Sequence, residues 1–334
     1  MGLDEVGKCV APGHSGEWNS LYFILGVILM PVALPFVLMK YFYRLRIKRY
    51  RNELAEKVVL ITGASSGLGE SLAHTFYKAG CKIIIAARRI EELERVKKDL
   101  LALDVGTVTF PPVIIPLDLA ELKDIPIFAQ KALDVHNQID ILINNGGISV
   151  RATALSSAVD VDLKLMVVNY FGSVALTKAI LPSMLKRKNG HICFISSVQG
   201  KFALPYRSAY SASKHALQAF SDSLRSEVAN KGVHVTCISP GYIRTQLSMN
   251  ALTASGETYG KMDKTTSSGM RPEKVANRIL HAILCKEKDI MISDLQAKFA
   301  YYARYIWPSF YFWIIEKRAL RLEREEVAEQ KKEK

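Results

Sequence analysis

Tyr210 and Lys214 are four residues apart, so on a helix their side chains lie on one face, a turn from each other. Ser197 follows the apolar run 191–195, which is typical of a buried strand. A hydroxyl, a phenol and an ammonium in one place can protonate a carbonyl oxygen. An ammonium about 5 Å from the phenol, at an effective dielectric of about 20, lowers the phenol pKa by about two units. Such Tyr–Lys pairs also occur by chance on helix surfaces, so the prediction depends on the motifs around them.

A glycine-rich loop lies near the start of the part of the chain that alternates strands and helices. Gly63, Gly67 and Gly69 follow the apolar run 58–61 and come directly before a predicted helix. Glycines let the backbone turn sharply and approach a pyrophosphate, and the N-terminus of the helix favours its negative charge. A tight turn without a ligand is the alternative, but the position between a strand and a helix favours a dinucleotide site.

The end of the second predicted strand indicates which dinucleotide this is. Proteins that bind NAD usually place a carboxylate there for the ribose hydroxyls. This chain has Ala87, Arg88 and Arg89 there, and Ser65 and Ser66 in the glycine loop. A guanidinium suits a 2′-phosphate, so the sequence favours NADP(H) over NAD(H), with Arg88 as the better-placed arginine. The alternative for Arg89 is a solvated charge at a helix start.

From residue 57 onward, short apolar runs alternate with helical patterns. Strands that are apolar throughout and linked by helices predict a parallel sheet covered on both faces. The predicted fold class is therefore α/β: a Rossmann-type, doubly wound, parallel seven-stranded sheet, with an N-terminal transmembrane helix in addition. The expected strands are 58–61, 81–87, 113–117, 140–144, a strand ending at 197, 233–239 and 289–292, and a long helix is expected over about 160–186.

The N-terminal region has three parts. Residues 1–20 form a polar tail, and the run 21–39 is apolar, uncharged and long enough to cross a bilayer as an anchor. A cleaved signal peptide is the alternative, but the run is too long and no small-residue cleavage site follows it. The linker 40–53 is strongly basic, so the positive-inside rule places the following domain in the cytosol. A lumenal orientation stays open.

The net charge of +13 raises the question of nucleic-acid binding. The basic residues concentrate beside the apolar run and in the C-terminal tail, and no nucleic-acid-binding motif accompanies them. A membrane surface explains this distribution better, so we expect a membrane partner and no nucleic acid. The five cysteines lack the spacing of a zinc site or a disulfide framework, so we expect no metal.

Together these motifs resemble those of the short-chain dehydrogenase/reductase family. The resemblance covers about 54–295, the expected catalytic domain, and is compatible with a homodimer. One departure is Gly146, where the family usually has alanine, and this should loosen the end of the fourth strand slightly. The matching motifs are Thr62-Gly63-x-x-x-Gly67-x-Gly69, Asn144-Asn145-Gly146-Gly147, Asn169, Ser197, Tyr210-x-x-x-Lys214 and Pro240-Gly241.

The resemblance implies a role for single residues in moving a hydride between a nicotinamide and a carbonyl carbon. Tyr210 would be the general acid/base, and Ser197 would hydrogen-bond the substrate carbonyl. Lys214 would bind the nicotinamide ribose and lower the pKa of Tyr210, while Asn169 would support a water-linked proton relay. The implied cofactor contacts are Gly63, Ser65, Ser66, Gly67, Leu68, Gly69, Arg88, Arg89, Asp118 (to the adenine), Leu119, Asn145, Gly146, Gly147, Tyr210, Lys214, Pro240, Gly241, Ile243 and Thr245.

The substrate is expected beneath the segment 242–270, since a loop of this length in a compact domain is usually a functional lid. An apolar pocket and a membrane anchor suggest a lipophilic ketone or aldehyde, such as a steroid, a retinoid or an acyl/alkyl-dihydroxyacetone phosphate. The candidate substrate contacts are Ser197, Gln199, Tyr206 and Tyr242, with Phe202, Leu247 and Met249 as further walls. Lys201, Arg207 and Arg244 are candidates for a phosphate headgroup, or equally for solvated charges.

The C-terminal region is divided into an aromatic and a charged part. The segment 296–320 is unusually aromatic, but Arg304 and Pro308 make it a poor spanning helix. Contact with a membrane interface or the active-site entrance, and packing against the domain, are equal alternatives for it. The charged tail 321–334 ends in Lys331-Lys332-Glu333-Lys334, which resembles a dilysine retrieval signal, although a solvated tail would look the same. We expect a single-pass protein of the endoplasmic reticulum membrane, with the peroxisomal membrane as the alternative.

The sequence therefore predicts a membrane-anchored, NADP(H)-dependent oxidoreductase that interconverts a carbonyl and a hydroxyl on a lipophilic substrate. A cellular pool rich in NADPH would favour reduction. The alternative is a protein that keeps the fold to sense a nucleotide or to scaffold partners. The complete set of Asn169, Ser197, Tyr210 and Lys214 favours the enzyme.

Overall fold

The computed structural model describes residues 30, 34–35, 37–38, 53–106 and 108–333. The chain divides into two compact units, Met1–Glu53 and Leu54–Lys334. The tail 1–20 lies outside the described residues, as do nearly all of the predicted membrane segment 21–39 and of the linker 40–53. The five described residues of the segment 21–39 are helical.

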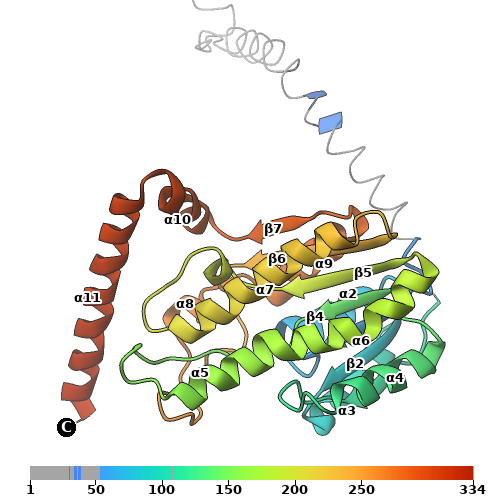
Figure 1. Ribbon diagram of the computed structural model, residues 1–334, viewed down its shortest axis with the longest axis horizontal. Coiled ribbons are helices and arrows are strands. Elements are labelled where there is room, and N and C mark those ends of the chain that lie inside the picture. Colours follow the sequence, from blue (N-terminus) through green and yellow to red (C-terminus); the bar gives the residue numbers. More distant parts are fainter. Residues whose placement is uncertain (1–29, 31–33, 36, 39–52, 107, 334) are drawn as a thin grey trace, which may run out of the picture. The chain divides into compact units, whose positions relative to one another are not determined.

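The second unit is built on a seven-stranded sheet in the order β3-β2-β1-β4-β5-β6-β7, in which every neighbouring pair is parallel (Figure 1). The five inner strands are buried along almost their whole length, as a parallel sheet with two covered faces requires. This confirms the predicted Rossmann-type sheet. The strands are β1 (Val58–Thr62), β2 (Lys82–Ala87), β3 (Val113–Pro116), β4 (Ile141–Asn144), β5 (Gly190–Ile195), β6 (Val233–Pro240) and β7 (Asp289–Ile292).

The two faces of the sheet carry separate cores because successive side chains of a strand point to opposite sides. In β1, Val59 and Ile61 pack with one set of helices, and Val58 and Leu60 pack with the other. The first set is α2 (Gly67–Tyr77), α3 (Ile90–Leu101) and α9 (Pro272–Leu284). The second set is α4 (Ile125–His136), α6 (Gly172–Arg187) and α7 (Ser208–Glu227).

A buried carboxylate ties β1 and β4 together at their amino ends. Asp140 is 4% exposed, and its Oδ2 accepts a hydrogen bond of 2.9 Å from the backbone N–H of Val58. Its Oδ1 lies 3.0 Å from Nη1 of Arg187. The strand order reverses between these two strands, and ligands of such sheets bind beyond the carboxyl ends at that point. Asp140 therefore helps to set the register of the two strands that frame the expected site.

The long helix expected over 160–186 is interrupted. It consists of α5 (Val159–Met166), a π-helical turn (Val167–Phe171) and α6. Among the described residues, the run Val159–Arg187 is also the one helix long and apolar enough to cross a membrane by composition. Half of its most apolar window is buried inside the domain, which is the behaviour of a core helix.

Two helices follow β7 at the C-terminal end of the chain, α10 (Leu295–Ile306) and α11 (Pro308–Glu333) (Figure 1). Tyr311 of α11 is buried, and its hydroxyl donates a hydrogen bond of 3.0 Å to the carbonyl of Ala203. Its ring meets the ring of Phe202 edge-on, with 6.4 Å between the ring centres. Phe202, which we expected to form a wall of the substrate pocket, instead holds α11 to the domain.

Candidate active site

A cavity with a volume of about 540 Å³ lies at the carboxyl ends of the strands. Every residue predicted to contact the cofactor lines it, and so do Ser197, Gln199 and Tyr242. The fold therefore brings these residues, which are far apart in the sequence, together around one cavity.

Some predicted residues are not among those that line this cavity. Asn169 lies behind the lining, and Tyr206 is absent from it, as are Phe202 and Met249. Of the three cationic candidates, Arg207 lines the cavity but Lys201 and Arg244 do not, and Lys201 is paired with Asp289 at 2.5 Å. The substrate contacts proposed for these residues stay predictions.

Tyr210 and Lys214 lie one turn apart on α7, beside the loop that follows β5. Both are buried, with 7% and 4% of their surface exposed. Lys214 Nζ donates a hydrogen bond of 2.9 Å to the carbonyl of Ile195 and lies 5.8 Å from the centre of the Tyr210 ring. The Ser197 hydroxyl is hydrogen-bonded to Tyr210 and also accepts from the N–H of Gln199 at 3.1 Å. A hydroxyl, a phenol and an ammonium thus meet at one end of the cavity.

The pKa of Tyr210 differs from our expectation. Burial raises it above its ordinary value, although the hydrogen bond from Ser197 and the charges of Arg207 and Arg151 act in the opposite direction. Burial also lowers the pKa of Lys214 to about 8. The prediction of a lowered tyrosine pKa was wrong here, because the burial of the phenol outweighs the hydrogen bond from Ser197 and the nearby arginine charges.

We expect carbonyl reduction to slow as the pH rises above about 8. Lys214 carries its charge below its pKa of about 8 and loses it above that value, whereas the raised pKa of Tyr210 keeps the phenol protonated throughout. His191 has its pKa lowered to about 3, so it stays neutral over the same range. The measurement is kcat for NADPH oxidation as a function of pH. A kcat that is constant through pH 8 and above would contradict this assignment.

Asn169 acts from behind the cavity wall. It lies in the π-helical turn and is fully buried. Its Oδ1 accepts from the N–H of Ile148 at 2.8 Å, and its Nδ2 donates to the carbonyl of Ile148 at 2.9 Å and to Oγ of Ser213 at 3.0 Å. The hydroxyl of Ser213 in turn donates to the carbonyl of Tyr210 at 2.8 Å. Asn169 therefore fixes the backbone beside Tyr210, and its part in a proton relay stays a prediction.

The glycine loop has the shape needed to hold a pyrophosphate. Gly63 and Gly67 have φ values of +66° and +61°, which side chains disfavour. A Cβ on Gly69 would lie 2.1 Å from the carbonyl oxygen of Gly63, and one on Gly67 would lie 3.0 Å from Cγ2 of Thr245. The N-terminus of α2 opens at this loop, so its free N–H groups suit an anion. A dinucleotide fits these residues.

Gly146 has a different effect from the one that we expected. Its N–H donates to Oγ1 of Thr62 at 3.0 Å, as does the N–H of Asn145. A Cβ at Gly146 would lie 2.6 Å from Cδ1 of Leu119. The missing Cβ therefore makes room for Leu119 in the cavity lining, and hydrogen bonds to Thr62 hold the end of β4.

The two arginines at the end of β2 both line the cavity, but they differ in their contacts. Arg89 Nη2 donates to Oγ of Ser65 at 3.2 Å and to Oγ of Ser66 at 3.1 Å. Arg89 is thus held across the glycine loop, which makes it at least as well placed for a 2′-phosphate as Arg88, the residue favoured from the sequence.

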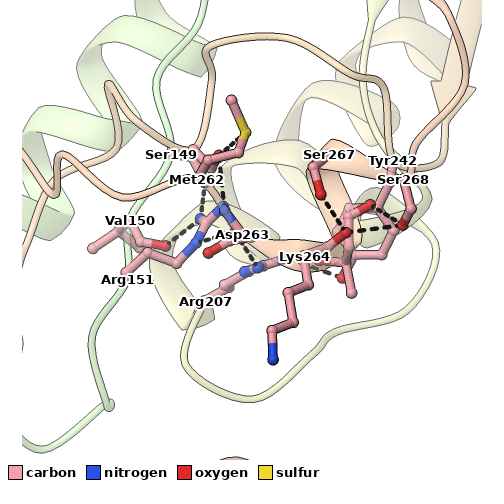
Figure 2. A network of polar contacts seen from close by, with 12 residues as sticks. Ser149, Val150, Arg151, Arg207, Tyr242, Met262, Asp263, Lys264, Ser267 and Ser268 are labelled. Carbon is pink, nitrogen blue, oxygen red and sulfur yellow. Dashed lines mark hydrogen bonds and ion pairs between the residues drawn. The ribbon is translucent and has the colours of Figure 1, made fainter. Parts of the chain in front are cut away.

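A network of charges lies near Tyr210 and includes residues of the cavity lining, and the sequence did not indicate it (Figure 2). Oδ2 of Asp263 accepts from Nη2 of Arg151 at 2.6 Å and from Nη2 of Arg207 at 3.1 Å. The hydroxyl of Tyr242 accepts from Nη1 of Arg207 at 3.0 Å and from Nη2 of Arg318 in α11 at 3.1 Å. Two guanidinium groups in the cavity lining therefore share a single carboxylate.

The segment 242–270 is anchored at its base and at its middle. The N–H of Arg244 donates to the carbonyl of Met270 at 2.9 Å, which closes the base. The N–H of Leu252 donates to the carbonyl of Ser149, and the N–H of Arg151 donates to the carbonyl of Leu252, both at 2.8 Å. The predicted lid is therefore a hydrogen-bonded cover, and Asp263 joins it to the wall of the cavity.

A group of possible metal ligands lies outside the cavity. His281, Cys285 and Glu287 bring three ligand atoms within 4.8 Å of one another. Both carboxylate oxygens of Glu287 are already bonded to the guanidinium of Arg278, at 2.8 and 2.7 Å. Because this cation neutralises the carboxylate, we assign no metal to the group.

Comparisons with known proteins agree with this geometry. The family model described as short chain dehydrogenase matches residues 57–255. A Dehydrogenase/reductase SDR family protein 7-like of Drosophila melanogaster is 67% identical over 98% of this chain and 99% of its own length. The Dehydrogenase/reductase SDR family member 7B of Danio rerio is 45% identical over 88% and 96%. Among solved structures, a closed serine dehydrogenase complexed with NADP+ matches with a TM-score of 0.62 and 29% identity, over 71% of this chain and 94% of that one.

Proposed function

Since this chain belongs to the short-chain dehydrogenase family, we propose that it is an NADP(H)-dependent oxidoreductase that interconverts a carbonyl and a hydroxyl on a lipophilic substrate. The observation that carries this proposal is the single cavity in which the glycine loop, Ser197, Tyr210 and Lys214 meet. An enzyme of this kind must hold the nicotinamide next to the carbonyl carbon and the proton donor next to the carbonyl oxygen of the same substrate.

The chain's residues supply the proton and the positioning. In the direction of reduction, Tyr210 gives its phenolic proton to the carbonyl oxygen, and Ser197 donates a hydrogen bond to the same oxygen. The Lys214 ammonium stabilises the phenolate that remains. A nicotinamide bound in the cavity supplies the hydride to the carbonyl carbon. Asn169 and Ser213 hold the backbone that positions Tyr210.

The preference for NADP(H) is supported by Arg88, Arg89 and the two loop serines, and no carboxylate occupies the end of β2. Arg89 and the serine hydroxyls already form one polar cluster beside the glycine loop. Such a cluster can bond a 2′-phosphate through charge-assisted hydrogen bonds.

We expect Arg89→Ala and Arg88→Ala each to weaken NADPH binding by about 10- to 100-fold, because a hydrogen bond to a charged group contributes about 1.5–3 kcal/mol. NADH lacks the phosphate, so its affinity should change little. The measurement is the dissociation constant of each nucleotide from its fluorescence on binding. Arg271→Ala, an exposed arginine outside the cavity lining, is the control. Equal losses for NADPH and NADH, or none for NADPH, would refute the assignment.

The cavity also supports the proposed substrate class. Its lining combines apolar side chains such as Ile148, Val168 and Leu252 with the guanidinium groups of Arg151 and Arg207. Of the three lipid classes considered, the positive charge favours the one that carries a phosphate, an acyl or alkyl dihydroxyacetone phosphate. The test is NADPH oxidation by the full chain, reconstituted in a membrane, over a panel of steroid, retinoid and phosphorylated lipid carbonyls. Turnover of none of them, with NADPH bound, would speak against the proposal.

We further propose that the enzyme is anchored by 21–39 in a single pass, in the membrane of the endoplasmic reticulum, with its catalytic domain in the cytosol. The apolar run, the basic linker after it and the lysines at the C-terminus support this location.

A further inference from the structure

Seven large apolar side chains between Leu295 and Trp313 are between 54% and 81% exposed, and six of them, all but Tyr305, make up the surface described here. Those on α10 recur at intervals of four, three and four residues, which places them on one side of the helix. We call this surface the α10–α11 face. Its residues are Leu295, Phe299, Tyr302 and Ile306 of α10, Trp307 between the helices, and Trp313 of α11.

Ring contacts make this face continuous across the two helices. Phe310 lies 6.4 Å from Phe299, 5.2 Å from Trp307 and 6.0 Å from Trp313, measured between ring centres. The rings of Phe310 and Trp313 are stacked, with 20° between their planes. One aromatic cluster therefore joins α10 to α11 along the exposed side.

Packing inside the domain does not account for this face. The buried side of the two helices consists of Ala303 and Tyr311, which pack against Phe202 and Leu204. That contact satisfies the expectation of packing against the domain, and it leaves the opposite side in contact with solvent. Monomeric proteins rarely expose a contiguous apolar surface with so many large side chains unless it binds a partner or a membrane.

The chemistry of the face identifies its partner. Tryptophan and tyrosine have an apolar ring with a polar edge, and they concentrate at the level of lipid headgroups. Within 295–318 the chain has four basic residues (Lys298, Arg304, Lys317 and Arg318) against one acidic residue, Glu316, while the next basic residue, Arg321, pairs with Glu325 at 3.1 Å. This balance complements an anionic surface.

The space between α10 and α11 has the same character. A groove with a volume of about 370 Å³ lies between the two helices, and its lining includes Leu295, Phe299, Ala300 and Ile314. Gln296 is the one amide among its lining residues, so the groove offers apolar surface to an acyl chain. We propose that the α10–α11 face lies in the interfacial region of an anionic membrane, as a contact separate from the predicted anchor 21–39.

The tryptophans of the chain allow a direct test. There are three, Trp18, Trp307 and Trp313, so Trp18→Phe leaves only the two on this face. This full-length variant is reconstituted in phosphatidylcholine vesicles with and without phosphatidylserine, made from ordinary or from brominated phospholipid. We expect brominated lipid to remove most of the tryptophan emission, more so with phosphatidylserine, while aqueous iodide has little effect.

Two other results would overturn the proposal. Quenching by iodide and not by brominated lipid would show that the face is solvated. The tryptophans could also be protected from both quenchers, and lose this protection when the protein is diluted with more lipid. That result would show that a second copy of the chain covers the face. These readouts do not require turnover, so they do not depend on the proposed activity.

A pair of matched substitutions locates the effect. Ile306 on the α10–α11 face and Ile127 on α4 are 79% and 60% exposed. In the Trp18→Phe background, Ile306→Glu should restore much of the emission in brominated vesicles, because a charge resists burial among lipids. Ile127→Glu should leave the quenching unchanged. Equal behaviour of the two variants would contradict the proposal, provided that circular dichroism shows both to be folded.

Discussion

Tyr210→Phe should lower the rate of carbonyl reduction by about 10²–10⁴-fold, the usual contribution of a positioned general acid, while NADPH still binds. Phenylalanine keeps the ring in its buried place on α7 and removes only the hydroxyl that meets Ser197. The glycine loop and Lys214 are untouched, so the affinity for the nucleotide should remain. The measurement is steady-state NADPH oxidation by the membrane-reconstituted chain, together with a separate titration of NADPH.

The control for this substitution is Tyr77→Phe. Tyr77 is buried at the end of α2 and does not line the cavity, so its loss of a hydroxyl should leave turnover unchanged. Wild-type turnover by Tyr210→Phe would refute Tyr210 as the acid. Equal losses in both variants would show that the effect comes from disturbed packing.

Asp263→Ala should lower the stability of the domain strongly, because Asp263 is the shared partner of Arg151 and Arg207. It leaves Arg151 and Arg207 facing each other, although each side chain is only 11% exposed. Removing one partner of a buried ion pair costs about 3–5 kcal/mol. At about 2–4 °C per kcal/mol for a domain of this size, the Tm should fall by roughly 6–20 °C. The same change removes the ion pairs of Asp263 that link the cover 242–270 to the cavity wall, while the backbone hydrogen bonds of Leu252 remain, so KM for the substrate should rise.

Thermal unfolding followed by circular dichroism, together with KM, checks this prediction. Glu257→Ala is the control, because Glu257 is an exposed carboxylate in the same cover, and we expect it to change the Tm little. Asp263→Asn should lie between the two, since the amide oxygen still accepts a hydrogen bond but carries no charge. A Tm for Asp263→Ala that matches the Glu257→Ala value would contradict the role of Asp263.

The sheet was predictable because its signals are local. Each inner strand is a mostly apolar segment of four to eight residues. The glycine loop, Asn145 and Ser197 stand directly after strands, so the rule that ligands bind beyond the carboxyl ends places them together. Residues at a fixed distance from a strand end could thus be assigned to the cavity from the sequence.

The rest of the site depends on contacts that the sequence does not reveal. Arg151 and Asp263 are 112 residues apart, and no local pattern marks either of them as a partner of the other. We expected Tyr206 and Phe202 to form apolar walls of the substrate pocket. Phe202 instead contacts Tyr311 of α11. The sequence could not reveal this contact, because α11 lies about 100 residues further along the chain. The pKa of Tyr210 likewise depends on burial, which spacing alone cannot give.

The π-helical turn Val167–Phe171 has a consequence for engineering this protein. Such a turn holds one residue more than the α-helical path would need, so the faces of α5 and α6 are out of phase by about 100°, the rotation per residue of an α-helix. A chimera that joins a relative's α5 to this α6 must keep the same number of residues between them. Deleting one residue from the turn would rotate α5 relative to α6, so that Asn169 and the side chains of α5 no longer face the same neighbours.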